Sequence, residues 1–421
     1  MKKEWKKVRL GDFIDILSGY AFKTTEFIDS GIPVIKIKNV NPPIVTQEDV
    51  SFVSEETSEK CSKFILNYND VLIAMTGSHI NQINSVVGRV ARVKYYNKTL
   101  LNQRVGKLLI TDKEHCDFDF VYHFLSQFET KVKLANIAGG VANQANISPN
   151  DIKGLEITLP PLPTQQKIAS ILSAYDDLIE NNRKQIKLLE EAAQKLYKEW
   201  FVKLNFPGHE TAKIVDGVPE GWNIQTVNDL QEKLESGSRP KGGIDSSIKN
   251  GIASVGAENV IGLGQYNYAS EKIVSNEFFE KAKRGIIENK DILIYKDGAY
   301  IGRTSLFQDN FPHEKAMVNE HVFTLHAEKE SYQYFLFFTL YQKTYFEKMQ
   351  KLNKNAAQPG INQDAIKSLK LLVPTDNLVN KYDELVTPMV DKIFTLAKQI
   401  VDLQSARDKL LPRLMNGELE V

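Results

Sequence analysis

Apolar residues recur every seven positions along residues 164–204, a stretch that contains neither Gly nor Pro. Such a stretch allows a helix of roughly 40 residues, about 60 Å long. Two heptad positions form its apolar seam, and they are occupied by Leu172, Ile179, Ile186, Ala193 and Trp200, and by Ile168, Tyr175, Asn182, Leu189 and Leu196. A long helix with so narrow a seam predicts a partner helix.

The same seam returns later in the chain at a constant offset of 214 residues, from Leu172 to Val386 onward. Its members are Val386, Ile393, Ile400, Arg407 and Leu414, and Tyr382, Met389, Leu396, Leu403 and Leu410. Arg407 is the polar exception here, as Asn182 is in the first seam, and a polar seam residue can fix the register of paired helices. Pro388 predicts a kink, or a helix that restarts there. The two helices are expected to pair within one chain.

A longer repeat surrounds the two helices. Short motifs recur in the same order in both halves, such as Ser18-Gly19 with Ser236-Gly237, Gly88-Arg89 with Gly302-Arg303, and Asn102-Gln103-Arg104-Val105 with Asn319-Glu320-His321-Val322. A repeat unit of this length indicates a duplicated domain rather than a short solenoid unit.

Each half combines short β-rich runs with a helical segment. The predicted elements are strands at 33–37, 71–74 and 108–110, a helix at 118–135 matched by 331–352, and a last strand at 155–159 matched by 369–373. The predicted fold class is therefore α+β, with two pseudo-symmetric α/β globules separated by two long antiparallel coiled-coil helices.

The predicted domain boundaries follow from this pattern. Residues 1–159 form the first globule and 160–205 the first long helix. A connector rich in Pro and Gly spans 206–220. The second globule covers 221–373, and the second long helix covers 374–421.

Composition narrows the class of protein. The 421 residues include 53 Lys and Arg and 53 Asp and Glu, so the net charge is zero. This balance argues against a protein that coats DNA through bulk charge, but not against local basic faces. Cys61 and Cys116 lack metal-ligand spacing and fit a reducing cytoplasm. The first ten residues lack the apolar core of a signal peptide, so we expect a cytoplasmic protein without a membrane partner.

The sequence offers little that suggests catalysis. Asn41-Pro42-Pro43-Ile44 looks like the catalytic motif of amino-methyltransferases, but Ile replaces the aromatic residue and no Gly-rich cofactor loop follows a strand upstream. The seven histidines include no paired helical spacing for zinc, and nothing resembles a P-loop. We expect no catalytic residue and no metal ligand in this chain.

The junctions around the helices carry a family resemblance. Leu159-Pro160-Pro161-Leu162-Pro163-Thr164-Gln165-Gln166-Lys167-Ile168-Ala169 is similar to a signature of the specificity subunits of type I restriction-modification enzymes. Residues 198–208, 218–222 and 411–419 resemble that family's end of the first conserved helix, its entry into the second recognition domain and its C-terminal motif. Residues 374–377 depart from the pattern, because they lack the double proline and the glutamine pair. Contacts at this second junction are expected to differ.

The resemblance implies a DNA-reading subunit without catalysis. Each globule would be a target recognition domain for one half of a split, asymmetric site in double-stranded DNA. The helices would set the gap and dock two methyltransferase (modification) subunits that carry S-adenosylmethionine. Motor-nuclease (restriction) subunits with ATP and magnesium would join for cleavage, and this chain itself would hold no cofactor.

Two other classes of function stay open from the sequence. A stand-alone DNA methyltransferase or nuclease would need a cofactor loop or a carboxylate cluster, and neither is visible. A coiled-coil structural adaptor would share the predicted architecture.

Candidate DNA contacts are polar residues in loops that follow matched strands, because Arg, Lys, Asn and Gln read base edges and Lys and Arg bind phosphates. In the first half they are Lys36, Lys38, Ser78, His79, Asn81, Gln82, Arg89, Gln103 and Arg104. In the second half they are Arg239, Lys241, Lys296, Tyr300, Arg303, Asn355 and Gln358. For any single residue the alternative is an ordinary solvated side chain.

Overall fold

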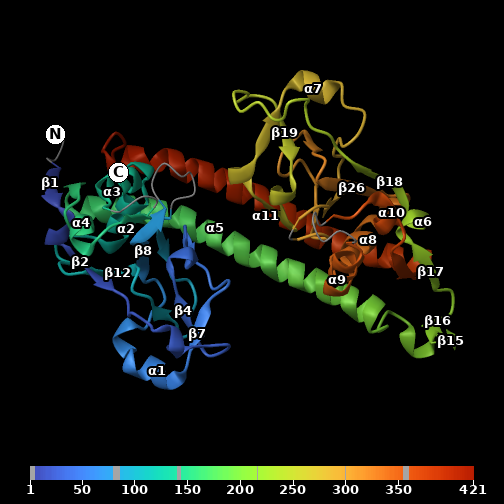
Figure 1. The fold of residues 1–421 in the computed structure, drawn as a ribbon, viewed down its shortest axis with the longest axis horizontal. Helices are drawn as coiled ribbons and strands as arrows, with labels where there is room; N and C mark the ends of the chain where they lie inside the picture. Colours follow the sequence, from blue (N-terminus) through green and yellow to red (C-terminus); the bar gives the residue numbers. More distant parts are fainter. Residues whose placement is uncertain (1–4, 79–85, 140–143, 216, 299, 354–359) are drawn as a thin grey trace. The chain divides into compact units, whose positions relative to one another are not determined.

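Two compact units make up the protein. The structure, a computed structural model, describes residues 5–78, 86–139, 144–215, 217–298, 300–353 and 360–421. Unit 1 comprises Met1–Leu178 and Leu403–Val421, and unit 2 comprises Ile179–Asp402. In each unit an α/β globule packs on a length of two long helices, α5 (Leu162–Tyr197) and α11 (Asp376–Met415) (Figure 1). The units divide both helices, so they do not correspond to the five predicted segments, whose limits stay predictions.

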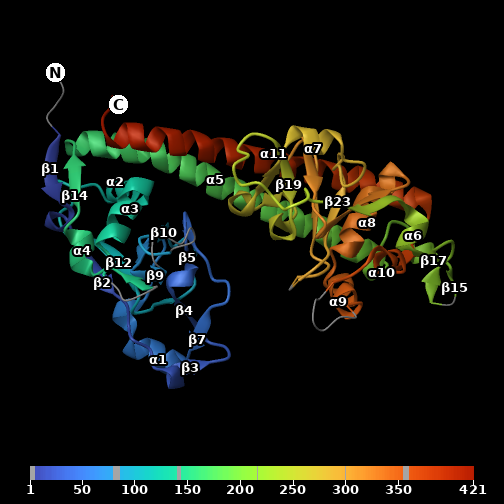
Figure 2. The same cartoon turned by 45° about the horizontal axis from the view of Figure 1, so that its top comes forward.

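The globule of unit 1 is built on two sheets. The larger has the order β2 (Ile14–Ser18), β12 (Val105–Ile110), β8 (Val71–Ala74), β10 (Val90–Arg92), β6 (Ile44–Val45) and β5 (Val40–Asn41). The smaller has the order β11 (Leu100–Leu101), β4 (Ile32–Ile35), β7 (Ser51–Val53) and β3 (Phe27–Ile28). The helices are α1 (Glu55–Lys60), α2 (Phe118–Ser126), α3 (Phe128–Ile137) and α4 (Pro149–Lys153). Figure 2 shows α2 and α3 close to α5, whereas α1 and β3 lie at the far end of the globule.

The globule of unit 2 repeats this plan. Its sheets have the orders β18 (Gln231–Ser236), β26 (Val322–Ala327), β23 (Ile292–Tyr295), β24 (Thr304–Leu306), and β22 (Lys272–Val274), β19 (Ile252–Val255), β25 (Ala316–Val318). A further pair joins β20 (Val260–Gly262) and β21 (Gln265–Tyr266), and the connector forms the hairpin of β15 (Ile214–Val215) and β16 (Val218–Pro219). The helices are α6 (Val227–Leu230), α7 (Asn276–Glu280), α8 (Gln333–Leu340), α9 (Lys343–Lys351) and α10 (Gln363–Lys367).

The predicted duplication is confirmed strand by strand. In unit 1, β1 (Lys6–Arg9) pairs antiparallel with β14 (Glu156–Leu159), and in unit 2, β17 (Asn223–Thr226) pairs in the same way with β27 (Lys370–Val373). In both units the last strand leads into a long helix. The central strands β8 and β23 are almost wholly buried, which explains their unbroken apolar sequences.

One predicted helix in each half is wrong in detail. The segments expected as single helices at 118–135 and 331–352 are each two helices, broken at Gln127 and Gln342. Both glutamines have extended backbones, with ψ of 139° and 141°, because each residue is the N-cap of the second helix. Apolar periodicity continues across such a break and therefore hides it.

The predicted seam between the long helices is confirmed in each unit. In unit 1 the start of α5 packs on the end of α11, with Ile168, Leu172 and Leu414 in one buried cluster. In unit 2 the end of α5 packs on the start of α11, where Ala193 and Ile393 are fully buried. This pairing is antiparallel. The helix α11 continues through Pro388, so the restart expected there does not occur.

Both polar exceptions in the seam have a partner on the other helix. Arg407 Nη1 lies 2.6 Å from Asp176 Oδ1, and the two side chains are 18% and 17% exposed. Asn182 Nδ2 donates to Gln399 Oε1 over 3.2 Å. Burial raises the pKa of the Asp176 carboxyl even though Arg407 lies beside it. These pairs are suited to fixing the register of the helices rather than to adding stability.

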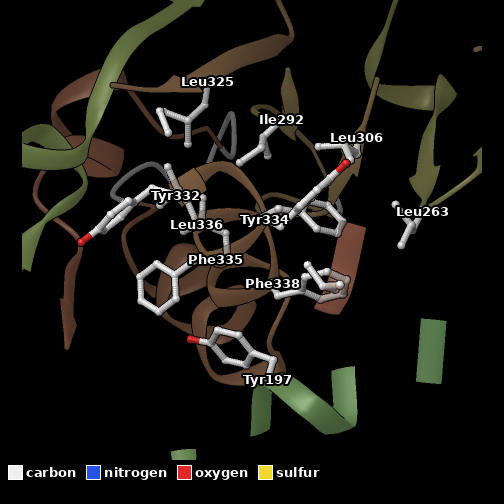
Figure 3. Packing of buried hydrophobic residues seen from close by; sticks show 14 of the residues in the cluster. Tyr197, Leu263, Ile292, Leu306, Leu325, Tyr332, Tyr334, Phe335, Leu336 and Phe338 are labelled. Carbon is white, nitrogen blue, oxygen red and sulfur yellow. The ribbon is translucent and has the colours of Figure 1, made fainter. Parts of the chain in front are cut away.

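The junctions between globule and helix differ in polarity between the units. At the positions that match Asp176 and Arg407 by the offset of 214, unit 2 has Val390 and Ala193, both fully buried. Its junction is aromatic instead. Figure 3 shows Tyr197 of α5 next to Phe335 of α8, with ring centroids 6.0 Å apart.

One side chain contact to the helices is nevertheless shared by the two units. In unit 1, Lys94 Nζ lies 3.6 Å from Asp177 Oδ1 of α5. In unit 2, Gln308 Nε2 donates over 2.7 Å to Asp391 Oδ1 of α11. Both pairs obey the offset of 214, so the duplication preserved the place where each globule holds its helix.

Gln165 shows why the junction signature contains a glutamine. Its side chain is fully buried, accepts from Asp117 N over 2.9 Å and donates to the carbonyl oxygens of His115 (2.9 Å) and Pro160 (2.8 Å). It therefore ties the first turn of α5 to the globule of unit 1. At the matching position unit 2 has Val379, whose side chain cannot form these hydrogen bonds. The second junction therefore differs from the first in this internal contact as well as in its sequence at 374–377.

We predict that Arg407→Ala lowers the free energy of unfolding by about 3 kcal/mol, because it leaves the Asp176 carboxylate buried without its cation. Urea denaturation measures this loss. The control is Arg413→Ala, whose ion pair is 55% exposed on the arginine side and should cost less than about 1 kcal/mol. Replacing both Asp176 and Arg407 by Leu should recover most of the stability. Equal losses in the single and double variants would contradict this account.

We also predict that Gln165→Ala destabilises unit 1 by about 1–3 kcal/mol, since three backbone groups lose their partner. Gln166→Ala is the matched control, because Gln166 is the exposed neighbour on the same helical turn. Thermal denaturation of the two variants side by side tests the expectation. Identical melting curves would show that the Gln165 hydrogen bonds add nothing measurable.

Candidate nucleic-acid interface

Three segments meet at the end of β8 in unit 1. Met75 N donates to Arg104 O over 3.0 Å, and Ile147 N donates to Met75 O over 2.9 Å. Strand β9 (Thr76–Ser78) then pairs with β13 (Gln144–Asn146), with Ser78 opposite Gln144. We call the described residues of these segments, 75–78, 102–105 and 144–147, the polar edge of unit 1.

Unit 2 has the same backbone arrangement at the end of β23. Lys296 N donates to His321 O over 3.0 Å, and Ile361 N donates to Lys296 O over 3.1 Å. Asp297 and Gly360 form an isolated β-bridge. The polar edge of unit 2 comprises residues 296–298, 319–322 and 360–361. A rigid strand end therefore positions equivalent loops in both units, which suits a binding site.

The polar edge of unit 1 presents neutral and cationic groups. Gln103 and Arg104 are exposed at the tip of its turn. Thr76 Oγ1 donates to Asn146 Oδ1 over 2.8 Å, which holds β9 and β13 together from the side chains as well. Ser78, Gln103 and Arg104 are thus sequence candidates that the structure brings to one edge.

The polar edge of unit 2 is a network of charges. Glu320 Oε1 lies 3.0 Å from Arg239 Nε and 3.5 Å from His321 Nε2. His321 Nδ1 lies 3.0 Å from Asp297 Oδ2, and Lys296 Nζ donates to Glu320 O over 3.0 Å. Arg239 and Lys296 are therefore brought together, and carboxylates lie between the cations.

Sequence reasoning missed Asp297, Glu320 and His321. The match between residues 102–105 and 319–322 was available, and carrying Gln103 and Arg104 across it gives Glu320 and His321. A search for typical DNA-binding side chains passes over acidic residues, although Glu and Asp can accept a hydrogen bond from cytosine.

Other candidates lie away from the polar edges. Lys36 caps the turn after β4, donates from Nζ to Ser51 Oγ over 2.8 Å and lies 4.2 Å from the Phe27 ring centroid. Partial burial, and next the charge of Lys38, lower the pKa of Lys36. Lys38 is exposed in the same turn, and Lys241 is exposed in the loop after β18.

Arg89 and Arg303 occupy matching positions in the sequences of the two units, at the offset of 214. Arg89 lines a cavity of about 250 Å³ together with Lys131 of α3 and Arg407 of α11. Arg303 stacks on Tyr300, with Cζ 4.0 Å from the ring centroid, and Tyr300 is 52% exposed. These residues belong to the flank of each globule.

The remaining candidates lie outside the described residues, and they are His79, Asn81, Gln82, Asn355 and Gln358. For all the candidates, contact with DNA stays a prediction.

Metal-ligating side chains do not gather in the described parts of the chain. Among those residues, no three His, Cys, Asp or Glu side chains lie close enough to hold a metal ion. Asn41 of the methyltransferase-like motif ends β5, and Pro43 lies in the turn before β6, where its carbonyl oxygen accepts from Arg92 N over 2.9 Å. No helix within the described ranges is long and apolar enough to cross a membrane.

Comparison with known proteins agrees with the duplication. The family model for the type I restriction modification DNA specificity domain matches residues 2–191 and again residues 219–404. The MjaIX specificity subunit of a type I restriction enzyme from Methanocaldococcus jannaschii is 25% identical over all of this chain and 94% of its own length. The MjaVIII specificity subunit of the same organism is 24% identical with the same coverage.

A solved structure has the same fold. The S subunit of a type I restriction-modification system from M. genitalium superposes with a TM-score of 0.58 at 18% identity, covering 98% of this chain and 96% of that one. The two copies of the domain model span most of the sequence and coincide with the two structural repeats. The chain therefore belongs to the family of type I restriction-modification specificity subunits, with one DNA specificity domain in each half.

Proposed function

We propose that this chain reads a bipartite, asymmetric DNA site, with one half-site for each globule, and leaves catalysis to partner subunits. The observation that supports this most directly is the pair of polar edges. They share one backbone arrangement, yet one carries Gln103 and Arg104 where the other carries Glu320 and His321. Equivalent scaffolds with different side chains suit the reading of two different short sequences.

The two long helices are proposed to dock modification subunits. Several large apolar side chains stay exposed on them although their other faces are buried, and these are Ile171 (36%), Leu178 (51%), Leu188 (64%) and Leu385 (47%). Exposed apolar residues on a helix whose seam is already filled favour contact with a further protein. In this proposal the helices also act as the spacer between the half-sites.

The proposal assigns the cofactors to the partners. S-adenosylmethionine would be bound by the two methyltransferase subunits, and ATP and magnesium by the motor-nuclease subunits. The polar edges themselves offer hydrogen-bond donors and acceptors, and those groups bind and orient DNA without transferring a group. A structural adaptor would not need two such edges. We expect the complex to act in the cytoplasm.

Half-site recognition tests the proposal. Substituting Ser78, Gln103 and Arg104 by Ala should relax the first half-site alone, with a loss of about 1–3 kcal/mol for each base pair that they contact. Long-read methylation mapping in cells that also express the modification subunits gives both half-sites at once. Lys113→Ala is the control, because Lys113 is exposed beyond the opposite end of β12. Simultaneous change of both half-sites would contradict independent reading.

Catalysis should depend on the partners. We predict that the full chain alone transfers no labelled methyl group from S-adenosylmethionine to DNA, because its polar edges bind and do not activate. The same preparation should become active once modification subunits are added. Methyl transfer by the chain without partners would favour the stand-alone methyltransferase instead.

A further inference from the structure

We propose that Gln103 and Glu320 are specificity-determining residues that read different bases from the same place in the two globules, adenine for Gln103 and cytosine for Glu320. This inference rests on the proposed function, because it assumes that the polar edges face DNA. It adds the identity of one base pair in each half-site.

The backbones around the two residues are equivalent. Asn102 N donates to Ile35 O over 3.1 Å, and Asn319 N donates to Val255 O over 3.0 Å. The turns close in the same way, because Val105 N and Val322 N point to the carbonyl oxygens of Asn102 (2.9 Å) and Asn319 (3.5 Å). The third residue of each turn also binds the neighbouring strand end, because Arg104 O accepts from Met75 N and His321 O accepts from Lys296 N. The side chains of Gln103 and Glu320 therefore start from equivalent backbone positions in the two units.

The side chains have the same length and differ in one group. The amide of Gln103 has a donor and an acceptor, which matches the acceptor N7 and the donor N6 of adenine in the major groove. The carboxylate of Glu320 only accepts, which matches the single N4 amine that cytosine presents there. Duplication followed by a change from amide to carboxylate thus alters the preferred base without altering the scaffold.

Glu320 is held in position before any ligand arrives. Lys296 binds its carbonyl oxygen, and the Asn319 side chain accepts from His321 N over 2.8 Å, so the turn is rigid. Its carboxylate oxygen Oε2 is buried and has no hydrogen-bond partner among the described residues, whereas Oε1 contacts Arg239 Nε. Oε1 is therefore the oxygen that a cytosine amine would meet, once Arg239 no longer occupies it.

In the free chain, Arg239 occupies the Glu320 oxygen to which the amine of a cytosine would otherwise donate. Its Nε contacts Glu320 Oε1, yet its side chain is 65% exposed and belongs to a basic loop. An exposed arginine can exchange a carboxylate for a DNA phosphate at little cost. Glu320 would then accept from the base amine. A carboxylate at a DNA surface repels phosphates, so this exchange explains why the edge tolerates one.

The test exchanges the two groups. The assembled complex of the full chain with its modification subunits selects DNA from a library randomised in both half-sites. The wild-type complex should require cytosine at one position of the second half-site, with about 10- to 100-fold discrimination. Glu320→Gln should move that preference to adenine and leave the first half-site unchanged. Gln103→Glu should move one adenine of the first half-site to cytosine.

Control variants separate base recognition from a general effect of charge on DNA binding. Glu328→Gln removes an exposed carboxylate beyond the other end of β26 and should change nothing. Arg239→Ala should weaken binding to all sequences alike. Tighter binding of every sequence by Glu320→Gln, with an unchanged preference, would mean that Glu320 only repels phosphate and would overturn the inference. Unmoved preferences in both exchanged variants, with melting curves like the wild type, would also overturn it.

Failure of the proposed function would look different. A wild-type complex that selects no two-part sequence would refute the reading of half-sites altogether. Selection of a clear two-part site whose bases ignore both exchanges would refute only the roles of Gln103 and Glu320.

Discussion

The structure depends on the burial of one narrow apolar stripe of α5 against α11. In each unit the globule packs on a helix pair that already shares a seam, so the seam supplies the platform on which the strands and short helices are placed. Ile168 and Leu172 serve this purpose in unit 1, and Ala193 and Ile393 in unit 2. Apolar contacts between two helices can form equally well at several registers. The polar pairs Asp176–Arg407 and Asn182–Gln399 favour one register over the others.

The two halves of the duplication share backbone hydrogen bonds at positions where their side chains differ. The pairs β1–β14 and β17–β27 and the backbone hydrogen bonds of Met75 and Lys296 at the ends of β8 and β23 match between the units, because a shifted strand register would expose the core. Side chains at the loop tips carry no such constraint, because they do not pack in the apolar core. The two units therefore carry different side chains at matching backbone positions, Gln103 and Arg104 in one and Glu320 and His321 in the other.

Much of the fold could be predicted from the sequence, and less of the site. Heptad spacing revealed both helices and even their polar exceptions, because burial imposes a period that survives divergence. The breaks at Gln127 and Gln342 escaped, since a single extended residue leaves the apolar pattern intact. Among the candidate residues, loops after strands indicated Arg104 and Lys296, and their contact with DNA stays a prediction. Glu320 is not singled out by its residue type, because its ion pair with Arg239 joins segments that lie far apart in the sequence.

The contrast between the two helix junctions makes the gene duplication hard to reverse. In a pair of identical first halves, the residue facing Asp176 would be the counterpart of Arg407, which is Ala193. A carboxylate would be enclosed without a cation, at a cost of several kcal/mol on each side. Two identical second halves would place Val390 opposite Arg407, so a largely buried guanidinium would lose the Asp176 carboxylate. Neither half alone contains both members of the Asp176–Arg407 pair, so two copies of either half would bury one unpaired charge at each end of the seam, and only the two different halves together avoid it.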